Sequence, residues 1–144
     1  MKNIQLCKMY TLMYGQTWYG KYGFMLCQPD TYIIDNIKLI NYNKNKLIMN
    51  NMKLKDFPLM KTYLQKYIKS EYNSNIKLNK TKFINIIKLY NHFNDNNKLL
   101  KDFIKEFLIN FDETCLIFYS FYEDLYNKLG LTDFYKHSYV KFIL

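Results

Sequence analysis

Three cysteines and two histidines are the residues in this chain that could provide a nucleophile or bind a transition metal. Cys7, Cys27 and Cys115 are far apart in the sequence, so they form neither a CxxC pair nor a disulfide framework. Neither His92 nor His137 has a second histidine or a cysteine at ligand spacing. A Cys–His nucleophile would require a distant pair, and Cys115 lies in an apolar stripe where a thiol is buried and inert. We therefore predict reduced thiols, no metal site and no catalytic residue.

A second chemical candidate is the segment at residues 15–24, Gly-Gln-Thr-Trp-Tyr-Gly-Lys-Tyr-Gly-Phe, which holds the only tryptophan and three of the four glycines. Its Gly-x-x-x-x-Gly-Lys spacing matches a phosphate-binding Walker A loop. However, Tyr22 stands where Ser or Thr must coordinate Mg²⁺, and the bulky Trp18 and Tyr19 occupy positions that wrap the phosphate. We therefore do not favour a nucleotide site.

The same segment supplies the candidate binding residues, which are Trp18, Tyr19, Lys21, Tyr22 and Phe24. The chain has no Ala and no Arg but many Lys, Asn, Ile, Tyr and Phe, which indicates an A/T-rich genome. Gly and Trp need G-containing codons, so codon bias does not explain this segment. Its rings could be buried against the C-terminal helix and strand, which is the arrangement we expect because aromatic clusters usually bury area. The alternative is an exposed epitope that binds a partner.

One resemblance concerns an enzyme family. Residues 18–24 resemble the aromatic-Tyr-x-Lys-aromatic-Gly-Phe stretch late in the GNAT acetyltransferase fold, and residues 126–131 are a fainter echo. The resemblance implies acetyl transfer from acetyl-CoA, with Tyr19 as the general acid. The Gln/Arg-x-x-Gly-x-Gly/Ala loop that holds the cofactor pyrophosphate is absent from the chain, so we predict no cofactor. A divergent or degenerate acetyltransferase is therefore an alternative, and an enzyme is not the favoured interpretation.

A second resemblance covers more of the chain. Residues 9–24, 111–122 and 129–134 are similar to uncharacterised proteins of giant DNA viruses. Those proteins carry a Gly-x-Thr-Trp-Tyr-Gly-Lys-Tyr-Gly-Phe segment, a helical middle and a Leu-Gly-Leu-x-x-Phe ending. The resemblance implies a viral origin and no known activity.

The net charge of +9 comes from lysines that are spread through the chain without a dense block. Such a charge attracts nucleic acid, but without Arg forks the binding would be non-specific and sensitive to salt. No apolar run reaches the length of a membrane span, and the start does not read as a secretory signal. We expect an intracellular, cytoplasmic protein without a membrane partner, in the host-cell cytoplasm or the virion. The favoured function is a non-enzymatic interaction domain of a large DNA virus with a protein partner, and a non-specific nucleic-acid binder is the second alternative.

Apolar residues at three-and-four spacing predict four amphipathic helices, at residues 57–69, 80–93, 98–111 and 112–129. Gly130 is expected to end the last of these in a left-handed conformation. The last two helices should form the centre of stability. In the helix at 80–93 we expect an inward face made of Phe83, Ile84, Ile87 and Tyr90.

The first third of the chain is harder to assign. Ile33, Ile34, Ile37 and Ile40 suggest a fifth helix, and residues 47–49 fit a strand or a helix. Residues 24–27 and 138–144 are expected to pair as short strands, because a lone strand leaves backbone groups unsatisfied. The sequence thus predicts one domain over residues 1–144, mainly α with a small β element (α+β). It would have four to five amphipathic helices and a short terminal strand pair, and its oligomeric state stays open.

Overall fold

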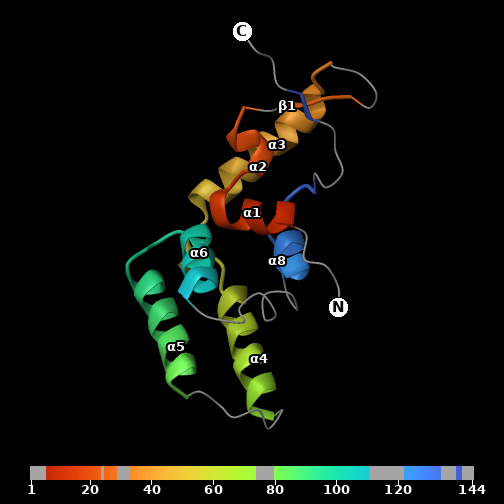
Figure 1. Cartoon of the computed structure of the whole chain (residues 1–144). Helices are drawn as coiled ribbons and strands as arrows, with labels where there is room; N and C mark the ends of the chain where they lie inside the picture. The colour runs from red at the N-terminus through yellow and green to blue at the C-terminus, as the bar shows by residue number, and fades with distance from the viewer. Residues whose placement is uncertain are drawn as a thin grey trace.

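The computed structural model describes residues 6–23, 25–28, 33–73, 80–110, 122–133 and 139–140 of the chain. Helices dominate this part (Figure 1). The α-helices are α1 (Leu6–Tyr14), α2 (Trp18–Lys21), α3 (Asn36–Asn51), α4 (Leu59–Asn73), α5 (Lys80–Asp95), α6 (Leu100–Asn110) and α8 (Tyr122–Lys128). A 3₁₀ helix, η1 (Leu54–Asp56), leads into α4. None of the helices in the described part is both long and apolar enough to cross a bilayer.

The arrangement is elongated, with α4 and α5 projecting at one end and α3 at the other (Figure 1). Helices α1 and α6 lie between these ends and contact each other. One cluster of buried side chains joins α1, α3, η1, α4, α5, α6 and α8. The hydrophobic core therefore runs through the middle of the molecule and leaves the outer face of α3 to solvent.

Helix α6 is the centre of this core. Its Leu100, Phe103, Ile104 and Phe107 are fully buried. The Phe103 ring contacts the rings of Tyr90, Phe93 and Phe107, with centroids 5.8 to 5.9 Å apart. The strong apolar periodicity that predicted this helix thus corresponds to the face that all its neighbours cover.

The expected α+β class is wrong, because the described fold is built from helices. Apart from two isolated antiparallel bridges, Cys27–Ile34 and Lys53–Leu99, extended pairing in this part is limited to two residues on each side, β1 (Met25–Leu26) antiparallel to β2 (Tyr139–Val140). A ladder this short presents no face on which helices can pack as a second layer. Of the other residues of the two expected strands, Cys27 forms an isolated bridge with Ile34, and Phe24 and residues 138 and 141–144 lie outside the described part.

Most of the helix predictions hold. The helices expected at 57–69, 80–93 and 98–111 correspond to α4, α5 and α6 within a few residues. Of the helix expected at 112–129, α8 is the described portion, since residues 111–121 fall outside it. Gly130 follows α8 with φ of 73°, which confirms its predicted left-handed conformation. Helix α3 absorbs the ambiguous residues 47–49, whereas α1 and α2 were not predicted.

The inward face expected for α5 is partly wrong. Ile84 and Ile87 are 52% and 48% exposed, while Ile86, Tyr90 and Phe93 are buried. Apolar residues of α5 fall on two overlapping helical stripes, so periodicity alone does not set the rotation of the helix. Contact with α6 and η1 selects the face that carries Phe93.

A reciprocal polar contact fixes α3 to the segment after α8. The buried side chain of Asn45 donates to the Thr132 carbonyl oxygen at 2.8 Å and accepts from the Thr132 N–H at 2.9 Å. Tyr126 also donates its hydroxyl proton to the same carbonyl at 2.8 Å. These bonds satisfy a buried amide that would otherwise destabilise the core.

Candidate functional site

The candidate binding segment, described over residues 15–23, forms a short helical turn rather than an extended loop. Gly15 ends α1 with φ of 77°, and its N–H donates to the Thr11 carbonyl at 2.8 Å. The Thr17 hydroxyl oxygen then caps α2 by accepting from the Gly20 N–H at 3.1 Å. Gly23, with φ of 84°, ends the turn. Two of the glycines therefore mark the two boundaries of this turn.

The backbone of this turn leaves no cradle for a phosphate. Besides the Gly20 bond to Thr17, the N–H of Lys21 donates to the Thr17 carbonyl, that of Tyr22 to the Tyr19 carbonyl, and that of Gly23 to the Gly20 carbonyl. A phosphate loop needs convergent N–H groups that are free to bind the anion. Because the N–H groups of residues 20–23 are already bonded within the turn, the geometry argues against the Walker A interpretation.

Three aromatic rings of the turn form an exposed surface, which we call the aromatic platform: Trp18, Tyr19 and Tyr22. Their side chains are 50%, 49% and 47% exposed. The Trp18 ring lies 5.2 Å from the Tyr19 ring at 83° and 4.8 Å from the Tyr22 ring at 59°. The expected burial of these rings in the core is therefore wrong, because about half of each side chain is exposed.

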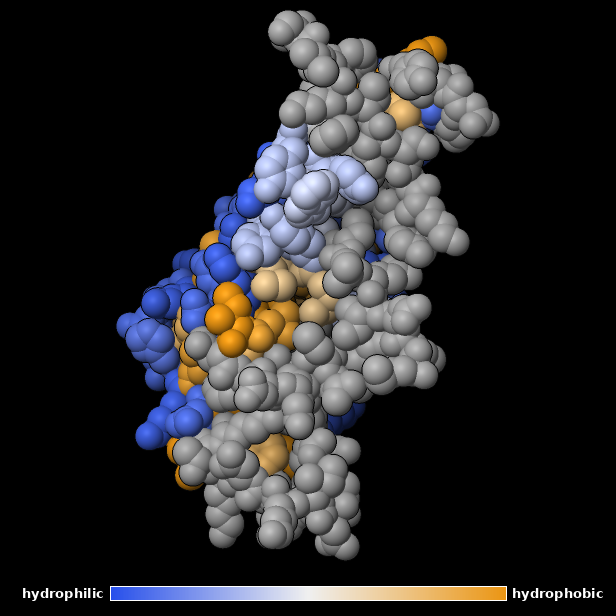
Figure 2. Space-filling model, in the orientation of Figure 1, coloured by the Kyte–Doolittle hydropathy of each residue, from blue (hydrophilic) through white to orange (hydrophobic). Residues whose placement is uncertain are grey.

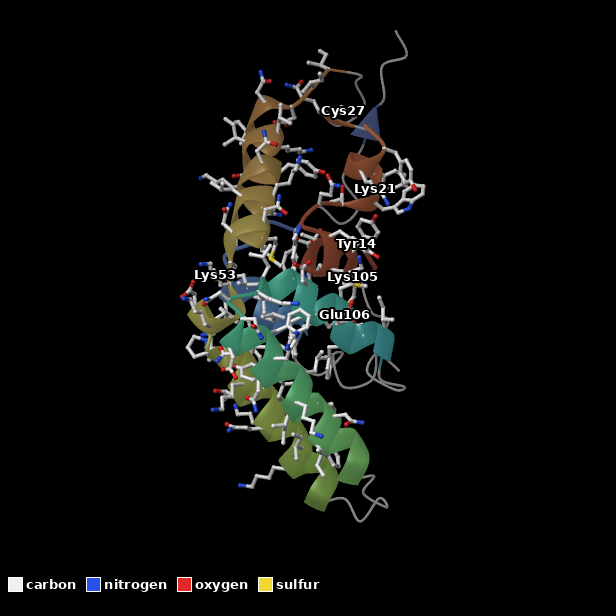
Figure 3. The ribbon with its side chains drawn as sticks, turned by 90° about the vertical axis from the view of Figure 1, so that its left-hand side faces the viewer. Tyr14, Lys21, Cys27, Lys53, Lys105 and Glu106 are labelled. Atoms are coloured by element: carbon white, nitrogen blue, oxygen red, sulfur yellow. The ribbon has the colours of Figure 1, made fainter. Side chains whose placement is uncertain are left out.

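Lysines border the platform on the side of α1. Lys21 Nζ lies 5.6 Å from the centroid of the Tyr22 ring and 5.9 Å from that of Tyr14. Lys105 of α6 approaches the same Tyr14 ring at 4.9 Å, and the Tyr10 and Tyr14 rings are 4.4 Å apart. Lys21, Tyr14 and Lys105 follow one another along one side of the molecule (Figure 3). A hydrogen bond with Tyr10 raises the pKa of Lys21, which further favours its charged form.

The platform is part of a continuous surface. Figure 2 shows a pale patch over α1 and α2, the hydropathy of Tyr and Trp, that adjoins the orange hydrophobic surface over α6. Beneath it, Gly20 packs against Tyr42 of α3, so α3 supports α2 from behind. This arrangement presents mixed aromatic and cationic chemistry on a supported helical turn.

The structure brings together four of the five binding residues predicted from the sequence: Trp18, Tyr19, Lys21 and Tyr22. The fifth, Phe24, lies outside the described residues. Sequence reasoning missed Tyr10, Tyr14 and Lys105. The i,i+4 spacing of Tyr10 and Tyr14 just before the turn could have indicated that the two rings lie together. Lys105 belongs to α6, far away in the sequence, and no local pattern indicates its place beside Tyr14.

Of the other chemical candidates, Cys27 and His92 lie in the described part of the chain, whereas Cys115 and His137 lie outside it. Cys27 is a buried free thiol, and His92 is exposed on α5, where Asn96 contacts it. Within the described ranges, no three His, Cys, Asp or Glu side chains are placed to hold a metal ion. No family model matches the sequence, and neither a curated protein nor a solved structure matches it.

Proposed function

We propose that this chain is a non-enzymatic interaction domain that binds a protein partner through the aromatic platform. The observation that carries the proposal is the half-exposed state of three adjoining rings on one hydrogen-bonded turn. Trp and Tyr dominate the energetics of protein interfaces, because they offer large contact areas at a low cost in side-chain entropy. A surface held in place by the contact between Gly20 and Tyr42 loses little further freedom on binding.

The geometry favours a protein over single-stranded nucleic acid. Successive bases stack on ring faces that are open and roughly parallel to one another, whereas Trp18 crosses Tyr19 at 83° and Tyr22 at 59°. Crossed rings still expose apolar surface that can contact apolar side chains of a protein partner. Lys21 and Lys105 at the border would then meet carboxylates at the rim of the partner interface. The resemblance to proteins of giant DNA viruses supports a viral origin and action inside the infected cell.

The experiment compares capture by the parent chain with capture by a Trp18→Ala/Tyr22→Ala variant. An Ile84→Ala variant serves as the control, since Ile84 is exposed to a similar extent on α5, away from the platform. Each immobilised full chain is incubated with an extract of the native host cell, with and without nuclease, and bound proteins are quantified. We expect a set of proteins that the control retains and the platform variant loses, independently of nuclease. Equal capture by both variants, or capture abolished by nuclease, would contradict the proposal.

A further inference from the structure

Two lysine ammoniums beside the aromatic platform are positioned by tyrosine rings and not by carboxylates. Lys21 Nζ lies 5.9 Å, and Lys105 Nζ 4.9 Å, from the centroid of the same Tyr14 ring. Tyr10 packs on Tyr14 with centroids 4.4 Å apart and forms a side-chain hydrogen bond with Lys21. Within the described ranges, neither of the two lysines forms an ion pair with an Asp or Glu side chain. We call Lys21 and Lys105 the lysine pair.

The lysine pair concentrates positive charge that no carboxylate in the described part of the chain neutralises. The negative face of an aromatic ring attracts a cation but does not remove its charge. Two ammoniums held at one ring therefore repel each other, and an anion that contacts both would relieve the repulsion. Contacts with the rings already restrict both side chains, so binding an anion costs less side-chain entropy here than at free surface lysines. The pair is thus suited to an anion.

The lysine pair is continuous with the aromatic platform. Lys21 belongs to α2, and its Nζ atom lies 5.6 Å from the centroid of the Tyr22 ring, which is part of the platform. Lys105 extends the charge to α6, where Figure 2 shows hydrophobic surface next to the patch over α1 and α2. In Figure 3 Lys21, Tyr14 and Lys105 follow one another from α2 toward α6. A ligand on the platform that extends toward α6 therefore meets both ammoniums.

We infer that the protein segment bound by the aromatic platform is acidic, with an apolar anchor on the rings and Asp or Glu carboxylates on the lysine pair. The inference rests on the proposed function and specifies the chemistry of the partner. Alternate side chains of an extended segment lie on the same side, about 7 Å apart, so two acidic residues there can each contact one ammonium. The net charge of +9 attracts an acidic partner at long range and repels a basic one.

An acidic protein segment fits this surface better than the phosphates of a nucleic acid. A single strand binds by stacking its bases on ring faces, and the rings of Trp18 and Tyr22, which cross at 59°, offer no parallel set. Recognition of phosphate also gains from Arg forks, which this chain lacks. A polar rim around an aromatic patch is typical of interfaces between proteins.

The fluorescence of Trp18, the only tryptophan of the chain and a part of the platform, reports binding directly. The full chain is titrated with three synthetic peptides: Glu-Glu-Leu-Phe-Glu-Glu, the same core flanked by lysines, and the glutamates with two serines as the core. We expect the first peptide to change the emission with a Kd of about 1 mM or lower, and the other two to bind at least about tenfold more weakly. Salt should weaken the first interaction, because it screens exposed charges. No binding of the first peptide, or equal binding of the lysine peptide, would overturn the inference.

Substitution of the lysine pair tests its role at constant net charge. The lysine-pair variant, Lys21→Gln/Lys105→Gln, should bind the acidic peptide at least about tenfold more weakly. Lys88→Gln/Lys128→Gln removes the same charge at exposed positions on α5 and α8 and should leave the affinity within about twofold of the parent. Circular dichroism of both variants checks that the helices are intact.

Two outcomes of this comparison would overturn the inference. Equal losses of affinity in both variants would show that only the overall charge matters. Tighter binding of a single-stranded oligothymidine than of the acidic peptide, lost in the lysine-pair variant, would show that a nucleic acid occupies the site.

Capture of proteins from the host-cell extract separates this inference from the proposed function. If the inference is correct, the lysine-pair variant loses the same proteins that the platform variant loses, and added salt weakens their capture. Proteins lost by the platform variant alone would contradict the acidic segment while the proposed function stands. Proteins retained by both variants would refute the proposed function, and the inference with it.

Discussion

Gly20 of α2 lies directly against the ring of Tyr42 on α3. A Cβ atom at Gly20 would stand 2.5 Å from Tyr42 Cζ and would overlap the hydroxyl end of the ring. Gly20 is therefore required for space, unlike Gly15 and Gly23, which adopt left-handed backbone conformations. This contact sets the distance between the aromatic platform and the helix behind it.

Gly20→Ala should displace the platform. Alanine favours a helix by up to about 1 kcal/mol over glycine, but overpacking against a ring costs about 1–3 kcal/mol. We expect the free energy of unfolding to fall by about 1 kcal/mol in urea melts, together with a shift in Trp18 fluorescence. In a Tyr42→Ala background the obstacle is gone, so the same substitution should be neutral or stabilising. A destabilisation that persists in that background would refute the contact.

Phe107→Ala and Trp18→Ala should differ sharply in their effect on stability. Phe107 is fully buried among the rings of α6, so its truncation should cost about 3–5 kcal/mol. Trp18 is half-exposed, so its truncation should change the free energy of unfolding by less than about 1 kcal/mol. Denaturant melts measure both values. Comparable losses for the two variants would show that the platform belongs to the core.

Asn45→Ala should weaken the attachment of α3. The change removes both hydrogen bonds with Thr132 and leaves the half-buried Thr132 N–H without this acceptor. We expect a loss of about 2 kcal/mol in thermal or urea unfolding. Asn43→Ala, at an exposed position on the same helix, should stay within about 0.5 kcal/mol of the parent. Equal effects of the two substitutions would show that the hydrogen bonds between Asn45 and Thr132 do not stabilise the attachment of α3.

Alkaline pH should destabilise the protein through Tyr63. Burial, with a further contribution from its hydrogen bond to the Asp124 carboxylate, raises the pKa of Tyr63 from 10.0 to about 12. Because the folded state favours the protonated phenol, this stabilisation is complete below pH 10 and is lost as pH rises toward 12. The loss is on the order of 2 kcal/mol. The free energies of unfolding of the parent and of Tyr63→Phe, measured from pH 8 to pH 12, should converge as pH rises. Curves that stay parallel would exclude a contribution from the ionisation of Tyr63.

Sequence periodicity identified the helices whose buried face is unique. In α6 the large apolar side chains other than the exposed Ile109 share one face, so both the existence and the orientation of the helix could be predicted. In α5 the apolar Ile84 and Ile86 lie on different faces, and only the contact with α6 decides between them. The α+β prediction was wrong because the strand-like composition of residues 24–27 and 138–144 does not determine how many of them pair. That number depends on tertiary contacts, and β1 and β2 pair over two residues each.

The residues of the aromatic platform could be found from the sequence, but their exposure could not. Trp18 and Tyr22 suit a core and an interface equally well, because both environments favour large aromatic surfaces. What decides their placement is the helical turn capped by Thr17 and the position of Tyr42 behind Gly20. The cap is a local contact, but the contact between Gly20 and Tyr42 joins two helices and is not encoded by any local pattern.

The support of α3 is uneven along its length. Its C-terminal half is anchored by the buried Asn45 and Met49, whereas its first turn relies on the Asp35 cap and on a bond from Lys38 Nζ to the Cys27 carbonyl at 3.3 Å. We therefore expect local unfolding of α3 to start at its N-terminal end, where amide hydrogen exchange should be faster than in its C-terminal half. Tyr42 lies at the border between the two halves. Each excursion that unwinds α3 as far as Tyr42 removes the wall behind Gly20, so the lifetime of the platform is set by how often the start of α3 opens.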